Sequence, residues 1–289
     1  MVDYLVVGLG LAGVSICHIL ERENKSFKVI ANGSQGSSWV AGGLYNPVVL
    51  KRFNAAWHAK EQLTLLKPFY ASLEEKLQIR LDYPMPVLRR FASPKEQNMW
   101  FEAADRPELK SFLDLELKPN SNPAIDAPLG FGSVTGTGRI DTRALVEHYQ
   151  EHLWKSGFLI REKFDYSALE PERDEVIYGR LRAKRIVFAT GIGLRENPYF
   201  NYLPLQGTKG ELLTIKAPQL KEHSVIKSSV FIIPLGDDLY RVGATYNWKD
   251  NSNEPTREAR EELLDKLHSF LRCDYELLDQ IAGIRPTVA

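Results

Sequence analysis

The sequence is poor in three things: cysteine, excess charge of one sign and long apolar runs. Its 289 residues contain only two cysteines, Cys17 and Cys273, which excludes a scaffold built on disulfides. Lysine plus arginine equals aspartate plus glutamate at 37 each, so the overall basic charge typical of nucleic-acid-binding proteins is missing. No apolar run is long enough to span a membrane, and Met1 leads into an expected strand rather than a signal peptide. We therefore expect a cytoplasmic protein with no membrane partner, and its oligomeric state is left open.

The first thirty residues predict a strand, a glycine-rich turn, a helix and a second strand. Residues 4–7 are a short apolar run, followed at once by Gly8, Gly10 and Gly13 in the order G-x-G-x-x-G; residues 27–31 are the second strand. In this context the first glycine allows a tight turn, the second lets a pyrophosphate approach the backbone, and the third lets helix and strand pack closely. The pattern predicts a Rossmann-type dinucleotide-binding unit. The alternative is that these glycines only pack a turn between a strand and a helix.

The identity of the dinucleotide is not fixed by this unit. The free N–H groups at the expected helix start, Leu11 and Ala12, would face the phosphates. Where an acidic residue usually binds the ribose, the chain has Ala31 and Asn32. Asn32 can hydrogen-bond a ribose, although more weakly than a carboxylate does. A missing acid also occurs where the 2′-phosphate of NADP is bound, but residues 32–38 contain no arginine to bind it.

Small residues and glycines fill the segment after the second strand. Residues 37–44 read SSWVAGGL, in which hydroxyl groups can reach a phosphate and bare backbone can lie against a flat ring. The candidate cofactor contacts in this segment are Ser37, Ser38, Ala41, Gly42, Gly43 and Leu44.

With this segment the sequence resembles the FAD-dependent oxidoreductases of the D-amino-acid oxidase superfamily, which includes glycine oxidase and sarcosine oxidase. In that superfamily a serine followed by small residues and glycine binds the pyrophosphate and the flavin ring. More narrowly, the run G-G-L-Y-x-P from Gly42, with Lys51 downstream, resembles the FAD-dependent domain of bifunctional tRNA 5-methylaminomethyl-2-thiouridine synthesis proteins. That domain oxidatively removes a carboxymethyl group from a wobble uridine. The resemblance implies FAD as the cofactor.

Further motifs follow in the superfamily's order along the whole chain. They are I-D-T-x-x-L from Ile140 with Asp141 as a helix cap, a strand ending at Phe164, A-T-G at Ala189, Thr190 and Gly191, L-Q-G-x-x-G from Leu205, V-G-A-T-Y ending at Tyr246, and G-I-R-P containing Arg285. The resemblance places Phe164 and the A-T-G turn beside the dinucleotide. It also implies that Arg285 pairs with a substrate carboxylate, to which a guanidinium is well matched.

Three tyrosines are candidates for the substrate cavity. Tyr45, Tyr240 and Tyr246 would either line that cavity or fill ordinary core. Together with Arg285, we take Tyr240 and Tyr246 as the catalytic candidates. A structural ion pair is the alternative role for Arg285.

The expected fold is α/β, with an FAD/NAD(P)-binding Rossmann-type domain interleaved with an α+β substrate domain built on a mostly antiparallel sheet. The FAD-binding domain is assigned residues 1–75, 135–204 and 283–289, and the substrate domain residues 76–134 and 205–282. In the superfamily, G-x-R-P continues into a strand, a glycine-rich turn and a helix beside the flavin. Because the sequence stops soon after this motif, we expect the C-terminal part of the FAD-binding domain to be missing.

Two other patterns point to different chemistry. His148 and His152 fit the H-x-x-E-H motif of zinc peptidases, but a third ligand is not apparent and we expect no metal. Lys51 and Arg52, with residues 89–90, could contact the phosphates of an RNA or simply be solvated charges.

The resulting functional prediction is an FAD-dependent oxidoreductase that oxidises the C–N bond of a secondary amine or amino acid. The resemblance implies hydride transfer to the flavin, hydrolysis of the imine and reoxidation of the flavin by oxygen. The alternatives are a tRNA wobble-uridine oxidase, an NADP-dependent dehydrogenase and a flavin-binding protein without turnover. The expected partner is a small amine or amino acid, or a tRNA in the second case.

Overall fold

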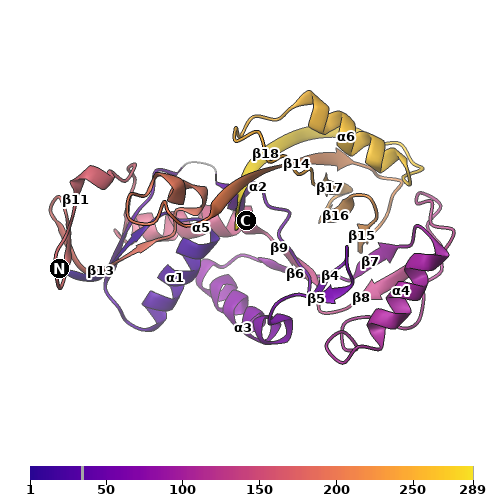
Figure 1. The fold of residues 1–289 in the computed structure, drawn as a ribbon, viewed down its shortest axis with the longest axis horizontal. Helices are drawn as coiled ribbons and strands as arrows, with labels where there is room; N and C mark the ends of the chain where they lie inside the picture. The colour runs from indigo at the N-terminus through magenta and orange to yellow at the C-terminus, as the bar shows by residue number, and fades with distance from the viewer. Residues whose placement is uncertain (34–35, 289) are drawn as a thin grey trace.

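Two sheets at opposite ends of an elongated molecule organise the fold. The computed structural model describes residues 1–33 and 36–288. A six-stranded sheet lies at the end that carries the N-terminus, and a seven-stranded sheet lies at the other (Figure 1). The strands β14 (Leu205–Lys216) and β18 (Glu276–Val288) run from the second sheet toward the first. We call the two halves the N-terminal lobe and the distal lobe.

The six-stranded sheet has the order β10-β2-β1-β13-β12-β11. Its parallel centre is apolar because both faces are covered, as a parallel sheet requires. The helices α1, α3 and α5 pack on one face with a cluster around Val6, Val29 and Tyr149. The strands are β1 (Val2–Val7), β2 (Phe27–Ile30), β10 (Leu159–Ile160), β11 (Leu169–Pro171), β12 (Val176–Tyr178) and β13 (Leu181–Phe188). The helices are α1 (Leu11–Arg22), α3 (Ala59–Leu77) and α5 (Thr142–Lys155).

A local signal in the sequence accounts for the start of α5. Asp141 caps α5, since its carboxylate accepts a hydrogen bond of 3.1 Å from the backbone N–H of Ala144. The strand expected to end at Phe164 ends earlier, because only Leu159 and Ile160 pair with β2.

The seven-stranded sheet has the order β18-β14-β17-β16-β15-β7-β8, and all its neighbours are antiparallel except β15 and β7. This confirms the mostly antiparallel sheet expected for the second half of the fold. Asp237 and Asp238, with φ of 51° and 59°, form the hairpin turn between β16 and β17. The remaining strands are β7 (Val87–Arg90), β8 (Phe131–Val134), β15 (Val225–Lys227), β16 (Phe231–Gly236) and β17 (Leu239–Gly243). The helices of this lobe are α4 (Pro94–Ala104) and α6 (Arg257–His268).

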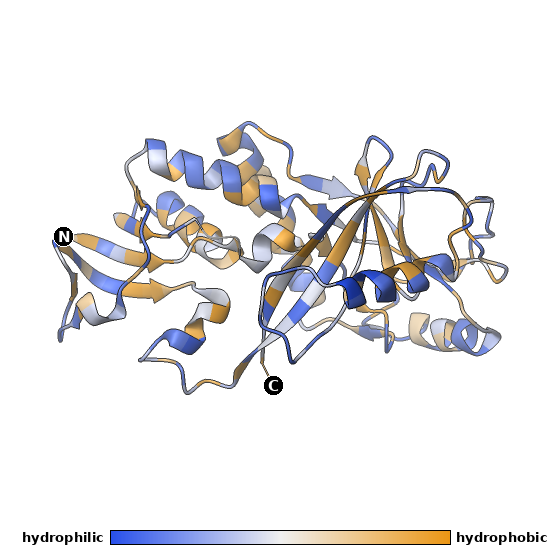
Figure 2. Ribbon diagram, turned by 90° about the horizontal axis from the view of Figure 1, so that it is seen from above, coloured by the Kyte–Doolittle hydropathy of each residue, from blue (hydrophilic) through white to orange (hydrophobic). Residues whose placement is uncertain are grey.

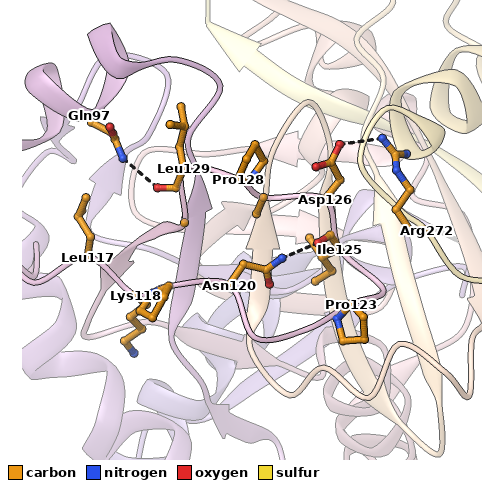
Figure 3. Close-up of a pocket in the computed structure, with 13 residues that line it drawn as sticks. Gln97, Leu117, Lys118, Asn120, Pro123, Ile125, Asp126, Pro128, Leu129 and Arg272 are labelled. Atoms are coloured by element: carbon orange, nitrogen blue, oxygen red, sulfur yellow. Dashed lines mark hydrogen bonds and ion pairs between the residues drawn. The ribbon is translucent and has the colours of Figure 1, made fainter.

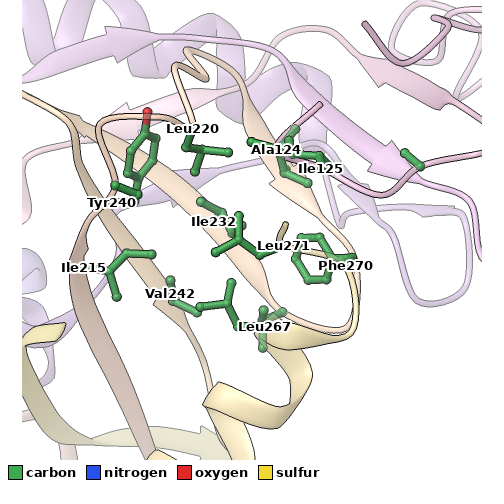
Figure 4. Close-up of a cluster of buried hydrophobic side chains, with 14 of the residues drawn as sticks. Ala124, Ile125, Ile215, Leu220, Ile232, Tyr240, Val242, Leu267, Phe270 and Leu271 are labelled. Atoms are coloured by element: carbon green, nitrogen blue, oxygen red, sulfur yellow. The ribbon is translucent and has the colours of Figure 1, made fainter. Parts of the chain in front are cut away.

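The two faces of this sheet differ because successive side chains of a strand point to opposite sides. One face packs against α6 in a cluster that includes Leu213, Tyr240, Val242 and Phe270 (Figure 4). The largely hydrophilic α6 covers mostly hydrophobic strands (Figure 2). We call this the α6 face. The opposite face looks toward the N-terminal lobe and is called the cavity face.

Short elements join the lobes. A three-stranded sheet has the order β3-β9-β6, and a two-stranded sheet pairs β4 with β5. These elements are β3 (Leu44–Tyr45), β4 (Val48–Val49), β5 (Asn54–Ala55), β6 (Asp82–Pro84), β9 (Gly138–Ile140), α2 (Ser37–Val40) and the 3₁₀ turns η1 (Tyr166–Ala168) and η2 (Gly191–Glu196).

The last strand corrects one part of the expected domain division. Residues 283–289 were assigned to the FAD-binding domain, and residue 289 lies outside the described residues. Residues 283–288 continue β18 without a break and pair with the start of β14, Gly283 opposite Gly210 and Val288 opposite Leu205. This end of the strand pair therefore belongs to the seven-stranded sheet. It contacts the N-terminal lobe because the two strands are long enough to extend that far. The rest of the division stays a prediction.

Candidate functional site

A pocket of about 430 Å³ lies at the glycine-rich turn between β1 and α1. The N-terminus of α1 opens into it, and Gly10 provides no side-chain cap there. Ser38 satisfies part of this terminus, since its Oγ accepts a hydrogen bond of 3.1 Å from Leu11 N–H. The expected residues that line the pocket are Gly8, Gly10, Leu11, Ala12, Asn32, Ser37, Ser38, Phe164, Ala189, Thr190 and Gly191.

Two of the turn glycines are required by backbone contacts. Gly8 has φ of +94°, and a Cβ on it would lie 2.5 Å from the carbonyl oxygen of Ala189. Gly13 does not line the pocket; a Cβ there would lie 2.2 Å from the carbonyl oxygen of Gly8. Gly13 therefore lets the helix pack against the turn, while Gly10 leaves the pocket floor open.

The far wall of the pocket is aromatic. The ring of Phe164 stacks on Tyr178 at a centroid distance of 4.6 Å and meets Phe188 edge-on at 5.9 Å. Tyr166 packs edge-on against Phe164 and also lines the pocket. This wall is a flat, apolar surface of the kind that a nucleoside base requires.

The donors around this pocket fit the pyrophosphate of a dinucleotide. Its charged lining residues are Glu162, Lys163 and Glu196, so a polyanion would be bound mainly by backbone N–H groups and the helix dipole. The buried Nε1 of Trp39 has no hydrogen-bond partner within residues 1–33 and 36–288, and Trp39 lines the same pocket. An unsatisfied buried donor at this place is consistent with a polar ligand.

A second cavity, of about 1360 Å³, adjoins the first and shares Leu11, Ser37, Ser38 and Pro286 with it. It lies between α2 with the following segment and the cavity face of the seven-stranded sheet. The expected residues Ala41, Gly42, Gly43 and Leu44 line it. Gly43 has φ of +71°, and a Cβ on it would lie 1.9 Å from the carbonyl oxygen of Ile140. The bare backbone of this segment thus faces the larger cavity directly.

Arg285 also lines this cavity, from β18. Its Nη1 donates a hydrogen bond of 3.3 Å to the carbonyl oxygen of Thr245, and its guanidinium lies 4.5 Å from the ring centre of Tyr246. No carboxylate among the described residues forms an ion pair with it. A Cβ on Gly210 would lie 2.1 Å from Nη2, so the missing side chain at Gly210 makes room for the guanidinium. Arg285 is therefore a cation held by backbone and ring contacts, with its charge not neutralised.

The three tyrosines separate. Tyr246 is 71% exposed and lines the cavity. Tyr45 lines it too, but its hydroxyl donates a hydrogen bond of 2.9 Å to Asp82, and burial together with this carboxylate raises the pKa of Tyr45.

Tyr240 was wrongly placed among the cavity residues. It is 3% exposed within the core cluster of the α6 face, and its hydroxyl accepts a hydrogen bond of 3.1 Å from Glu222 N–H (Figure 4). The physical reason is strand alternation, because Tyr240 and Val242 point to one side of β17 while Arg241 and Gly243 point to the other.

Residues outside the cofactor and catalytic candidates complete the cavity. Lys227, Phe231 and Ser228, which the sequence did not single out, line it together with Arg89 and Lys51. Arg89 forms an ion pair with Glu96 and donates a hydrogen bond of 3.2 Å to the carbonyl oxygen of Ser228. Lys227 ends a short apolar strand, and only its pairing with neighbouring strands shows which way it points.

The histidine pair of α5 is engaged with other groups. His152 Nε2 lies 2.9 Å from Glu21 Oε1, and His148 Nδ1 lies 2.8 Å from the carbonyl oxygen of Ala144. Within the described part of the chain, no group of three or more His, Cys, Asp or Glu side chains is arranged to hold a metal ion.

A third hollow of about 800 Å³ lies in the distal lobe, away from both pockets (Figure 3). Several of its polar groups are bound by protein atoms: Gln97 donates to the carbonyl oxygen of Leu129 at 2.8 Å, and Arg272 pairs with Asp126 at 2.8 Å. These groups are already satisfied within the protein.

Comparison with known proteins agrees with this geometry. A family model described as "FAD dependent oxidoreductase" matches residues 3–289. The solved structure of glycine oxidase from Bacillus cereus has a TM-score of 0.81 and 19% sequence identity, covering 99% of this chain and 83% of that chain. Iminodiacetate oxidase from Chelativorans has a TM-score of 0.72 and 17% identity, covering 99% and 84%. L-α-glycerophosphate oxidase from Mycoplasma pneumoniae, solved with FAD bound, has a TM-score of 0.73 and 15% identity, covering 99% and 83%. Among the described residues, no helix is long and apolar enough to cross a membrane.

Proposed function

The chain belongs to the family of FAD-dependent oxidoreductases, and from that premise we propose that it oxidises the C–N bond of an amine that carries a carboxylate. The observation that carries this proposal is Arg285, a guanidinium without a carboxylate partner in the cavity that adjoins the dinucleotide pocket. Glycine oxidase and iminodiacetate oxidase, which share the fold, are named for substrates of this kind. The NADP-dependent alternative does not fit the family.

The residues of the first pocket would hold the adenosine and pyrophosphate of FAD. Backbone N–H groups at Leu11 and Ala12 and the hydroxyl of Ser38 would bind the phosphates, with Phe164 beside the adenosine. The backbone of residues 41–44 would face the flavin ring in the adjoining cavity. When bound, FAD supplies a two-electron acceptor for the carbon next to nitrogen.

The protein's own contribution is positioning. Arg285 would hold the substrate carboxylate by a paired hydrogen bond, and its backbone and ring contacts fix the direction of the guanidinium. Tyr246 lies against this guanidinium and covers one of its faces. A carboxylate bound there leaves the amine and its neighbouring carbon directed into the rest of the cavity, where the backbone of residues 42–43 is exposed.

The test uses the FAD-loaded protein without oxygen. Sarcosine and iminodiacetate should bleach the visible absorbance of oxidised flavin, whereas dimethylamine, which lacks the carboxylate, should do so far more slowly. In Arg285→Met the advantage of the carboxylated amines should disappear, and Arg180→Met, on an exposed turn between β12 and β13, is the matched control. Equal rates with both amine classes in the unaltered protein would contradict the proposal.

A tRNA-borne substrate is the second candidate, suggested by the resemblance described above. Of the cations that the sequence offered for RNA contact, however, two are turned inward. Arg89 pairs with Glu96, and Arg90 donates a hydrogen bond to the carbonyl oxygen of Asp126. Lys51 and Arg52 are exposed. The expected cytoplasmic location stays a prediction.

A further inference from the structure

Lys227 is an ammonium group without an anionic partner inside the larger cavity. No hydrogen bond or ion pair joins Lys227 to any other described residue. Its Nζ makes a cation–π contact with Phe231, whose ring centre lies 4.3 Å away. Burial lowers the pKa of Lys227 to about 8, with Arg89 and Lys266 adding to the effect and Glu96 opposing it. The fold thus holds a poorly solvated cation here and does not neutralise it.

The neighbours of Lys227 are fixed by the sheet register. Lys227 lies directly opposite Arg89 on β7 and opposite Phe231 on β16, so all three side chains share the cavity face. Glu96 is the carboxylate of this group, and it is taken by Arg89, whose Nε it contacts at 2.9 Å. Because Arg89 and Glu96 neutralise each other, the positive charge of Lys227 remains available to a ligand.

Lys227 and Arg285 stand on well-separated strands of the sheet. The two residues are on β15 and β18, which are separated by β16, β17 and β14 in the sheet. At about 4.8 Å for each of four steps, the strand axes lie roughly 19 Å apart in a flat sheet, so the two side chains start from distant positions. Both residues nevertheless line the same cavity.

We propose that Lys227 is the binding group for a second anion of the substrate, a carboxylate or a phosphate at the end remote from the oxidised C–N bond. The inference rests on the proposed function, because Arg285 is taken to hold the first carboxylate. The inference assigns the substrate to the class of extended carboxymethylamines with a distal anion. Such a substrate would extend through the cavity from Arg285 to Lys227.

The experiment compares ligands that differ only at the distal end. N-carboxymethyl derivatives of ω-amino acids of increasing chain length are titrated into the FAD-loaded protein by calorimetry without oxygen. The matching ω-amides and the N-carboxymethyl ω-aminoalkyl phosphates form the other two arms. At the chain length that fits, we expect an anionic end to bind about tenfold more tightly than the amide, a modest factor because the site is partly solvated. The ratio of acid to phosphate tells which anion the site prefers.

Variants then assign the preference to Lys227. In Lys227→Gln the ratio of anionic to amide affinity should fall to about one, and Lys227→Arg should keep most of it because the charge is retained. Lys216→Gln, an exposed lysine of the same sheet outside the cavity, should behave as the unaltered protein does. Equal affinity for acids and amides at every length, or a preference that survives in Lys227→Gln, would overturn the inference. Flavin bleaching by the ω-amides tests the proposed function separately, since they retain the carboxymethylamine.

Discussion

Two lysines on opposite faces of the seven-stranded sheet, one buried and one half-buried, differ in what surrounds them. Lys209, on the α6 face, is fully buried and contacts Asp250 at 2.5 Å and Glu211 at 3.5 Å. It also donates to Ser252 Oγ at 3.1 Å and to the carbonyl oxygen of Glu254. Lys227, on the cavity face, has none of these contacts among the described residues.

The two lysines differ in whether the protein supplies an anionic partner. A cation with such a partner stabilises the fold, whereas a cation without one is available to a ligand. Around Lys209, carboxylates and a carbonyl replace the lost water, so the cation ties the segment before α6 to β14. Lys227 and Arg285 have no carboxylate partner among the described residues, so an anionic partner for them would have to be a ligand. A partner-free cation in a cavity is thus a better indicator of a binding site than burial alone.

The largest effect should follow from removing the paired lysine. Lys209→Met removes the cation that pairs with Asp250 and with the buried Glu211. We expect a loss of about 3–5 kcal/mol in the free energy of unfolding. Urea denaturation followed by tryptophan fluorescence measures it, with Lys216→Met as the surface control. A change below about 1 kcal/mol would mean that the two lysines do not differ in the way described.

A smaller effect is expected beside Arg285. Gly210→Ala places a methyl group where the guanidinium lies, so Arg285 must move. We expect this overpacking to lower the free energy of unfolding by about 1–3 kcal/mol. Binding of sarcosine to the FAD-loaded variant should weaken, whereas Arg285→Met in the same background should have little further effect. Independent, additive losses would show that Gly210 does not act through Arg285.

Removal of the unpaired lysine should have the opposite sign to removal of Lys209. Lys227→Met takes away a poorly solvated charge and keeps most of the apolar contact with Phe231, so we expect stability to rise by about 1 kcal/mol. Thermal unfolding of the ligand-free protein measures it. A clear loss of stability would show that Lys227 has a structural partner.

The last expected effect is a dependence on pH. The pKa of Lys227 is near 8 in the folded chain and near 10.5 in the unfolded chain, so between these values the unfolded state holds the extra proton. Stability should therefore rise as pH rises through this window. The increment should be absent from Lys227→Met and present in Lys216→Met, when unfolding free energies are compared at several pH values.

Several of the residues that local patterns and the family resemblance singled out lie together in the structure. The glycine turn, the segment at residues 37–44 and Arg285 all line the two adjoining cavities, because each motif fixes its own backbone within a few residues. The continuation of β18 was not predicted, since it depends on pairing with β14 some seventy residues earlier in the chain.

Side-chain direction was the harder part. In β17 the motif was identified correctly, yet Tyr240 and Arg241 differ by one position and therefore by a whole face of the sheet. Lys227 could not have been identified from its own strand. Its lack of a partner depends on Glu96 binding Arg89, which is a contact between β7 and α4.

The dinucleotide pocket also has a consequence for the order of synthesis. Its lining begins at Val7 and ends at Pro286, and β1 pairs with β13, whose residues are made some 180 positions later. While the chain emerges from the ribosome, β1 and α1 must wait for most of the protein before their sheet can close. The distal lobe likewise needs β18 for its edge. Uptake of FAD at this pocket should therefore be a late event, and the nascent chain should depend on protection from premature association until then.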